Sequence, residues 1–246
     1  MEETAAERRF AEEYRLAREV PRDGLTAWRA AVAAEVALAP GASVVDVGAG
    51  TGAFAAAFAE WFGVRVLAVE PAAAMRALIP RTADIEPLDG RAEALPLPDH
   101  CADAAWLGSV VHHIGDLPAA ARELRRVLKP GAPVLIRNSF PGRCARDLRV
   151  RFFPGVERIV DRYPSVEETC AAFAGAGFSR VALHAVPQES APSLAVFADR
   201  IRRDTDAKLR GIDDEEFERG LGRLRQAASQ EPDRPAVSWM DLLVLS

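Results

Sequence analysis

An aspartate and a run of glycines stand together in VVDVGAGTGAF, at residues 44–54. Asp46 lies inside an apolar run, and the glycines follow at alternate positions: Gly48, Gly50 and Gly52. A glycine-rich turn between a strand and a helix lets a ligand approach the backbone and face the helix N-terminus. The stretch therefore indicates a binding loop, and the alternative is a tight turn that holds no ligand.

A second acid, Glu70, ends the next apolar run, where a carboxylate can accept hydrogen bonds from both hydroxyls of a ribose. Gly48, Gly50 and Ala53 also satisfy the loose pattern G-x-G-x-x-[GA], so a nicotinamide dinucleotide is an alternative ligand. The carboxylate of Asp46 would repel a pyrophosphate but attract a sulfonium or an ammonium group. S-adenosylmethionine carries both of these cations and no phosphate, and it is the predicted cofactor.

The glycine loop needs a strand before it and a helix after it, and this alternation continues for about ninety residues. Short apolar strands are predicted at residues 44–47, 64–69, around Ile85, 104–107 and 133–137. Helical patterns separate them, and Asp116 can cap the one that stops at Lys129-Pro130-Gly131. Strands that alternate with helices through short loops predict an α/β fold with a largely parallel sheet.

Both ends of the chain are predicted to carry helices. Residues 1–39 form two helices, and the capping box at 165–168 begins another. A sixth strand is expected at 181–186 and a terminal one at 239–245, with a pair of helices at about 190–233 between them. We expect one domain over the whole chain, with the apolar stripes of the inserted helices buried against the body or a second subunit.

Composition and charge exclude several classes of protein. The chain has 246 residues and a formal net charge of −5, which disfavours a nucleic-acid partner. No apolar run approaches the roughly 18 residues of a membrane span, and residues 1–10 do not read as a signal peptide. Cys101, Cys144 and Cys170 are odd in number and far apart, so neither disulfides nor a metal site is predicted. A cytoplasmic protein, monomer or homodimer, is expected.

Four motifs taken together resemble the class I S-adenosylmethionine-dependent methyltransferases: VVDVGAGTG, VLAVEP, GRAEALPLPDHCADAAW and HHIGDLPAAARELRRVLKPGAPVLI. The nearest group is the small-molecule branch that includes the ubiquinone/menaquinone C-methyltransferases. The resemblance implies a Rossmann-like, seven-stranded sheet in the order 3-2-1-4-5-7-6 with strand 7 antiparallel. It also implies a helical lid at 1–39, a cofactor-binding core at 40–140 and an insertion at 190–233 that covers the acceptor side.

The same resemblance implies which residues contact the cofactor. The loop would hold the methionine part, Glu70 the ribose, residues 91–93 the adenine edge, and residues 107–109 the region near the methyl group. Many relatives have an aspartate where Arg91 stands, and arginine has no acceptor for the adenine amino group. The full predicted set is Tyr14, Arg18, Asp46, Gly48, Ala49, Gly50, Thr51, Gly52, Glu70, Pro71, Met75, Arg91, Ala92, Glu93, Leu107, Gly108 and Ser109.

Methyl transfer from a sulfonium requires alignment with the acceptor and exclusion of water, and a hydroxyl, amine or acidic carbon must also lose a proton. His112 and His113, in the turn after the fourth strand, are the candidate proton acceptors, with His112 slightly favoured. The alternative is that they serve packing. Tyr14 and Arg18 belong to the predicted lid with Trp28, although Tyr14 and Trp28 could simply pack the leading helices against the sheet.

Polar residues after the fifth strand are further candidates for the acceptor side. Asn138 and Arg143 could line an acceptor pocket or lie in an exposed loop. Arg146, Arg149 and Arg151 could receive an acidic acceptor, although a solvated face is the simpler interpretation.

Three functions remain open. The first is methyl transfer to O, N or C of a small-molecule metabolite, with S-adenosylhomocysteine as product. The second is an NAD(P)-dependent oxidoreductase, which Asp46 disfavours. The third is a cyclase or regulator that binds the cofactor without methylating.

Overall fold

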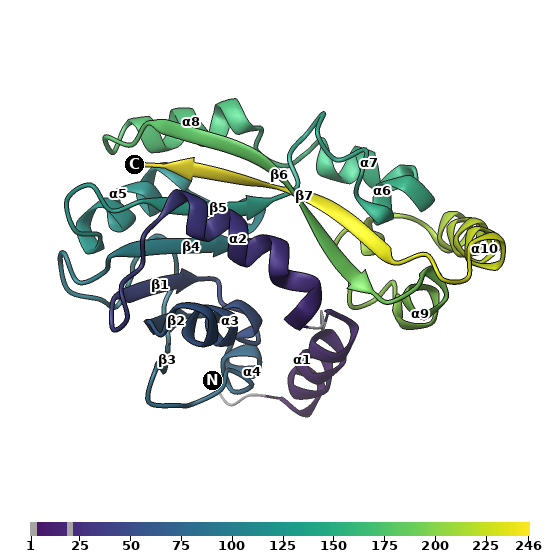
Figure 1. The fold of residues 1–246 in the computed structure, drawn as a ribbon, viewed down its shortest axis with the longest axis horizontal. Helices are drawn as coiled ribbons and strands as arrows, with labels where there is room; N and C mark the ends of the chain where they lie inside the picture. The colour runs from purple at the N-terminus through teal and green to yellow at the C-terminus, as the bar shows by residue number, and fades with distance from the viewer. Residues whose placement is uncertain (1–3, 19–21) are drawn as a thin grey trace.

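One seven-stranded sheet organises the computed structural model, which describes residues 4–18 and 22–246 (Figure 1). Its order is β3-β2-β1-β4-β5-β7-β6; the first five strands run parallel, and β7 runs antiparallel to both β5 and β6. The predicted topology is confirmed. The strands are β1 Ser43–Val47, β2 Arg65–Val69, β3 Ile85–Leu88, β4 Ala104–Gly108, β5 Val134–Asn138, β6 Arg180–Ala191 and β7 Ala236–Leu245.

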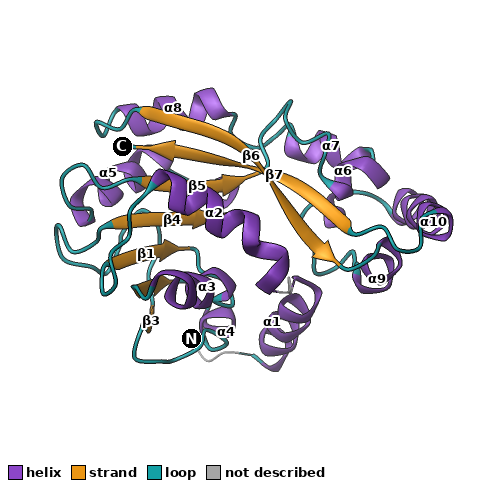
Figure 2. Ribbon diagram, viewed as in Figure 1, coloured by secondary structure: helices purple, strands orange, loops and turns teal. Residues whose placement is uncertain are grey.

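Helices cover both faces of this sheet (Figure 2). The α-helices are α1 Ala5–Arg18, α2 Thr26–Glu35, α3 Ala53–Phe62, α4 Ala73–Arg76, α5 Leu117–Val127, α6 Leu148–Phe152, α7 Gly155–Val160, α8 Val166–Ala174, α9 Leu194–Arg200 and α10 Asp214–Gln230. Single 3₁₀ turns are η1 Arg22–Leu25, η2 Val111–His113 and η3 Leu209–Gly211. As predicted, Asp116 caps α5, accepting from the Ala119 N–H at 2.8 Å, and Ser165 forms a capping box with Glu168 at α8.

The central strands are apolar on both sides because side chains alternate between two buried faces. Val45 and Leu107 point into a cluster that Leu124 of α5 and Phe173 of α8 complete. The opposite face, with Trp106 at its centre, packs against α2 and α3 in a second cluster. This burial on both faces explains why the strands read as short continuous apolar runs.

Strands β6 and β7 are longer than the sequence predicts. Only Asp241–Leu245 of β7 pairs with β5, whereas Ala236–Met240 pairs with the second half of β6 alone. The two strands therefore project past the end of β5 and carry α9 and α10 (Figure 1). The prediction ended β6 at 186, and the next residues, PQES, are mostly polar. Their polarity has a structural reason, since Gln188 and Ser190 line a cavity.

A third apolar cluster lies under this projecting arm. Phe153 of the α6–α7 segment, Leu194 of α9 and Leu224 of α10 are fully buried in it. The sequence analysis did not predict α6 and α7, which are only one or two turns long and lack a readable apolar period. The inserted helices are therefore buried against the body of the same chain, one of the two alternatives for their apolar stripes.

Candidate active site

A cavity of about 1060 Å³ opens at the carboxyl ends of β1, β2, β4 and β5. This is the edge where open α/β sheets bind ligands. Pockets for one drug-sized ligand have volumes of about 300–1000 Å³, so the cavity has room for two small ligands side by side. We call the part lined by residues 46–113 the cofactor half and the part lined by residues 137–240 the acceptor half.

The glycine loop forms the floor of the cofactor half. Gly50 has φ +58°, and a Cβ built on it would meet nothing within 4 Å, because it would project into open space. Gly48 has φ +69°, and a Cβ there would lie 2.3 Å from a methyl carbon of Val110. Both positions need glycine for their left-handed backbone, and Gly48 also needs it because Val110, in the turn after β4, approaches so closely. At Gly50 the loop therefore presents its backbone to the cavity, with no side chain above it.

Glu70 holds this loop in place. One carboxylate oxygen, Oε2, accepts the Gly50 N–H at 2.8 Å, and Oε1 accepts the Ala72 N–H at 2.9 Å. The sequence analysis assigned Glu70 to a ribose and did not foresee this structural contact. A carboxylate oxygen has two acceptor sites, so each oxygen of Glu70 retains capacity for a ligand hydroxyl.

Asp46 is the most unusual group in the cavity. Its side chain is 3% exposed, and Oδ2 has no hydrogen-bond partner among the described residues. Burial, together with the neighbouring charge of Glu70, raises the pKa of Asp46 to about 8. A buried carboxylate in this state has a strong affinity for a cation, which would replace the lost water and lower that pKa again.

Most of the predicted cofactor residues lie along the cavity: Tyr14, Asp46, Gly48, Ala49, Gly50, Thr51, Gly52, Glu70, Pro71, Met75, Gly108 and Ser109. Four others are placed elsewhere. The side chains of Ala92 and Leu107 are buried in an apolar cluster. Glu93 accepts the Gly115 N–H at 3.1 Å, and the exposed Arg91 lies 3.7 Å from Glu93. The side chain of Arg18 lies outside the described residues.

His112 and His113 both line the cavity, in the turn between β4 and α5. Nδ2 of Asn138 donates to the Ser139 carbonyl at 3.1 Å, which orients the Asn138 oxygen toward His112. An amide oxygen only accepts, so Nδ1 of His112 is the donor across the 3.3 Å contact. In the neutral ring, Nε2 then carries the lone pair. The ring also stacks on Tyr163, with centroids 3.9 Å apart.

The residues after β5 separate into several environments. Asn138 lines the cavity, whereas Arg143 forms a two-pronged ion pair with Asp241, both contacts at 2.9 Å. Arg149 does not lie on a solvated face: it lines the cavity and pairs with Asp206 and Asp147. The sequence analysis did not foresee the partners Asp206 and Asp241, because both come from segments far along the chain.

A buried ion network fixes the insertion to the body. Asp147, the N-cap of α6, contacts Lys208 Nζ at 2.5 Å, and Lys208 also donates to Ser139 Oγ at 2.8 Å. Burial alone would raise the pKa of Asp147, but Lys208 and Arg149 lower it to about 2. The network joins α6 and the end of β5 to the segment before η3, and so closes one wall of the acceptor half.

Several buried polar atoms that line this cavity have no hydrogen-bond partner among the described residues. Within residues 4–18 and 22–246, the buried side-chain atoms that line it and have no hydrogen-bond partner include Asp46 Oδ2, Trp106 Nε1, Ser190 Oγ and Thr205 Oγ1. Buried polar atoms in native proteins are nearly always satisfied, so such a group indicates a place for a polar ligand. Asp46 belongs to the cofactor half, and Ser190 and Thr205 belong to the acceptor half.

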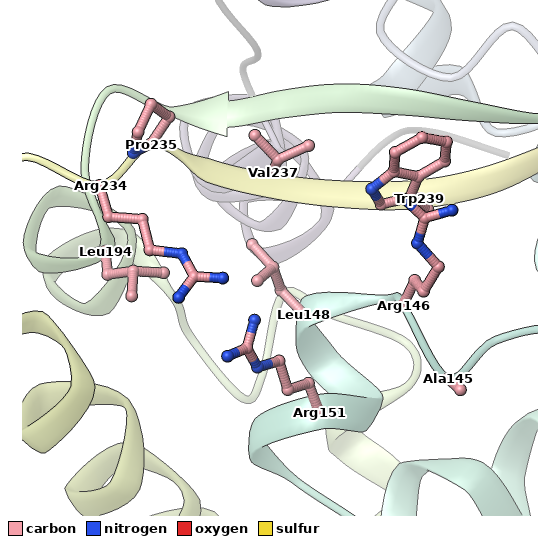
Figure 3. A pocket seen from close by; sticks show the side chains of 9 residues that line it. All are labelled: Ala145, Arg146, Leu148, Arg151, Leu194, Arg234, Pro235, Val237 and Trp239. Atoms are coloured by element: carbon pink, nitrogen blue, oxygen red, sulfur yellow. The ribbon is translucent and has the colours of Figure 1, made fainter. Parts of the chain in front are cut away.

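A second, smaller hollow of about 590 Å³ lies beside α6 and the projecting end of β7 (Figure 3). Arg146 lies over the ring of Trp239, 3.2 Å from its centroid, and the guanidinium groups of Arg151 and Arg234 point into the hollow beside Leu148. Successive residues of β7 thus face opposite ways, since Trp239 lines this hollow whereas Ser238 and Met240 line the large cavity. The hollow shares a wall with the acceptor half but not its space.

The described part of the chain contains neither a helix long and apolar enough to cross a membrane nor a group of three side chains suited to a metal ion.

Comparison with known proteins shows that this chain is similar to methyltransferases in both sequence and fold. A family model described as a methyltransferase domain matches residues 45–136. Malonyl-[acyl-carrier protein] O-methyltransferase of Serratia marcescens is 40% identical over 104 residues, covering 42% of this chain and 40% of that protein. A ubiquinone/menaquinone biosynthesis C-methyltransferase of Syntrophotalea carbinolica is 35% identical over 115 residues, covering 44% of this chain and 48% of that protein. The matches thus span less than half of each relative.

The fold similarity extends further than the sequence similarity. A crystal structure from Anabaena variabilis, described as a methyltransferase from an antibiotic biosynthesis pathway, superposes with a TM-score of 0.70 at 20% identity. It covers 94% of this chain and 99% of that one. Residues 45–136 therefore match a methyltransferase domain, and the chain has the fold of the class I S-adenosylmethionine-dependent methyltransferases and resembles the ubiquinone/menaquinone C-methyltransferases.

Proposed function

We propose that this protein transfers a methyl group from S-adenosylmethionine to a small-molecule acceptor. The observation that carries the proposal is Asp46: a buried carboxylate with an unpaired oxygen, beside a glycine loop with open space above Gly50. This arrangement suits a ligand with positive charge and no phosphate, because a pyrophosphate would face two carboxylates, those of Asp46 and Glu70.

The residues of the cofactor half fit that ligand. Asp46 and the loop at residues 48–52 would hold its cationic amino-acid part, and Glu70 would accept hydrogen bonds from its ribose. When bound, S-adenosylmethionine supplies a methyl group on a positively charged sulfur. The chain's own task is then to hold the acceptor in line and keep water out, and Tyr14 of α1 and the inserted segment at 194–210 wall the cavity for this purpose.

His112 is the proposed proton acceptor. Its Nδ1 is committed to Asn138, which leaves Nε2 as the basic nitrogen of the neutral ring. Stacking on Tyr163 holds the plane of the ring, so the nitrogen keeps a defined direction. A histidine at near-neutral pH suits this role when the acceptor is a hydroxyl, an amine or an acidic carbon. The names of the two relatives include an O- and a C-methyltransferase, so both kinds of acceptor atom remain in the proposal.

The test is ligand-induced stabilisation. A saturating ligand at about 100 times its Kd stabilises the native state by about 2.7 kcal/mol, which raises the Tm of a chain of this size by about 5–10 °C. We expect this rise with S-adenosylhomocysteine and none with NAD⁺. Asp46→Asn should reduce the rise. Stabilisation by NAD⁺ alone would favour the oxidoreductase and contradict the proposal.

A second measurement separates methyl transfer from mere binding. Radiolabelled S-adenosylmethionine is incubated with the protein and a panel of small organic acids, phenols and amines, and labelled product is extracted. Product formation supports the proposal. Tight binding of S-adenosylhomocysteine without product from any acceptor in such panels would favour the non-methylating alternative.

A further inference from the structure

We propose that the acceptor is a small organic anion, and that Arg137 binds its carboxylate or phosphate group inside the acceptor half of the cavity. The inference rests on the proposed function, because only methyl transfer would make the bound anion an acceptor. The anion site itself is argued from the residues that line the cavity.

The two halves of the cavity carry opposite charge. Residues 46–113, which line the cofactor half, include two carboxylates, those of Asp46 and Glu70, and no lysine or arginine. Arg15 and Arg22 of the leading segment also line the cavity, and Arg22 is paired with Glu60. The cationic residues that line the acceptor half are Arg137, Arg149, Arg200, Arg202, Lys208 and Arg210. The two carboxylates of the acceptor half, Asp147 and Asp206, are already in ion pairs with Lys208 and Arg149. The lining is therefore strongly positive, although the chain as a whole has a net charge of −5.

Arg137 sets the position of the anion. It stands near the end of β5 with 8% of its surface exposed, and it is always charged. Nη1 donates to Ser109 Oγ at 2.7 Å and Nη2 donates to Gln188 Oε1 at 2.6 Å. The rings of Trp28 and Phe54 each lie 5.1 Å from the guanidinium carbon. These contacts hold the charge at the boundary between the two halves.

Two hydroxyl groups supply further donors. Ser190 Oγ, on the projecting part of β6, and Thr205 Oγ1, in the inserted segment, are buried and have no hydrogen-bond partner among the described residues. A hydroxyl rotates freely enough to donate to a ligand oxygen. A carboxylate or phosphate has several acceptor sites and can satisfy such donors together with a guanidinium, which a neutral apolar acceptor cannot do.

The entrance of the acceptor half has the same sign. Arg200, Arg202 and Arg210 are exposed, and within the described ranges none of them contacts a carboxylate. Arg202 donates to the backbone carbonyls of Asp199 and Ile201. Exposed cations that line a cavity raise the local concentration of anions. The proposed cofactor is also cationic. Both the arginines of the acceptor half and the cofactor would therefore attract an anionic acceptor more strongly than a neutral or cationic one.

The experiment measures probe binding to the protein saturated with S-adenosylhomocysteine. Benzoate and phenyl phosphate are the anionic probes, benzamide is the neutral match and benzylamine is the cationic one, all titrated by calorimetry or ligand-observed NMR. We expect one or both anions to bind at least about tenfold more tightly than benzamide, the effect of a charge-assisted hydrogen bond or more. Comparing benzoate with phenyl phosphate separates the two sources of the anion.

Variants assign the effect to Arg137. Arg137→Gln should weaken binding of the preferred anion at least about tenfold while benzamide changes little. Arg151→Gln is the matched control, because it removes one arginine charge from the hollow of Figure 3 and not from the cavity. If Arg137→Gln does not fold, Arg200→Gln with Arg202→Gln, both on exposed side chains, should still make anion binding weaker and less sensitive to salt.

The outcomes are distinct. If S-adenosylhomocysteine does not bind, the proposed function fails. If it binds but benzamide or benzylamine binds as tightly as the anions, the anionic acceptor is refuted and methyl transfer stands. Unchanged anion affinity in Arg137→Gln, or an equal loss in Arg151→Gln, would also overturn the proposal.

Discussion

In the cofactor half of the cavity, the loop after Asp46 and the carboxylate of Glu70 come from two consecutive strand–turn units. In the acceptor half, the polar contacts join Arg137 to Gln188 and Lys208 to Asp147, across 51 and 61 residues of chain. The first half presents mainly backbone and bare glycine surface, and the second presents long charged side chains. The difference indicates that the cofactor half depends on local backbone conformation, whereas the acceptor half depends on distant ion pairs.

The largest effect is expected for Gly50→Val. A branched side chain at φ +58° is strained, and it would occupy the open space above the loop. We expect no measurable binding of S-adenosylhomocysteine in calorimetry while far-UV circular dichroism stays unchanged. The matched control is Gly222→Ala in α10, where a Cβ also meets nothing but the backbone is helical, so binding should be normal. Micromolar binding by Gly50→Val would show that the bare loop is not the ligand surface.

His112→Ala tests the boundary between the two halves. Loss of a general base lowers turnover by about 10²–10⁴-fold, and here kcat should fall by at least about 100-fold. The Kd of S-adenosylhomocysteine should change less than about threefold, because the glycine loop is untouched. His113→Ala serves as the comparison and should have the smaller effect on kcat. A rate within a few-fold of wild type would remove His112 from the role of base.

The pH dependence of cofactor binding tests Asp46. Its pKa of about 8 in the free protein means that a proton must leave before the ammonium group of the ligand can pair with the carboxylate. Affinity for S-adenosylhomocysteine should therefore rise from pH 6 to pH 8, by up to roughly tenfold per unit, and level off above. Asp46→Asn should bind more weakly at pH 8 and show a flat profile. A flat profile in the wild type would contradict the buried, protonated state.

The same pKa affects the stability of the free protein. Because the folded pKa of Asp46 is raised above the ordinary value of 3.8, the folded state binds more protons than the unfolded state between about pH 4 and 8. This group's contribution is therefore fully present below about pH 4 and is lost as pH rises through 8. Urea unfolding without ligand should show Asp46→Asn gaining stability relative to wild type as pH rises across this window.

The smallest effect is expected for Lys208→Met, which tests the acceptor half. Removing one partner of a fully buried ion pair costs about 3–5 kcal/mol, but Arg149 still faces Asp147, so we expect a loss of about 1–2 kcal/mol in urea unfolding. Lys129→Met is the control, because the exposed pair of Lys129 with Asp103 should contribute less than about 1 kcal/mol. Equal losses in the two variants would mean that the Asp147 network is no more than a surface contact.

The sequence by itself determined the five parallel strands, the glycine loop and the two carboxylates of the cofactor half, and the family resemblance supplied the strand order. These depend on local rules: burial on both faces makes a strand read as an apolar run, a left-handed turn requires glycine, and a capping residue such as Asp116 begins a helix. The loop and its neighbouring carboxylate follow directly from two consecutive units of this kind. Asp46 could therefore be identified from its place in the run, although its unpaired oxygen could not.

Tertiary structure alone decided the acceptor half. Arg137 reads as an interruption of an apolar strand, Tyr163 follows a helix that has no clear period, and Lys208 lies in a segment without a motif. They meet because β6 and β7 extend past β5 and the inserted helices pack back against α6 and α7. Strand register and packing between distant segments decide which side chains face one another across such a cavity. The spacing of neighbouring residues in the sequence predicts neither of them.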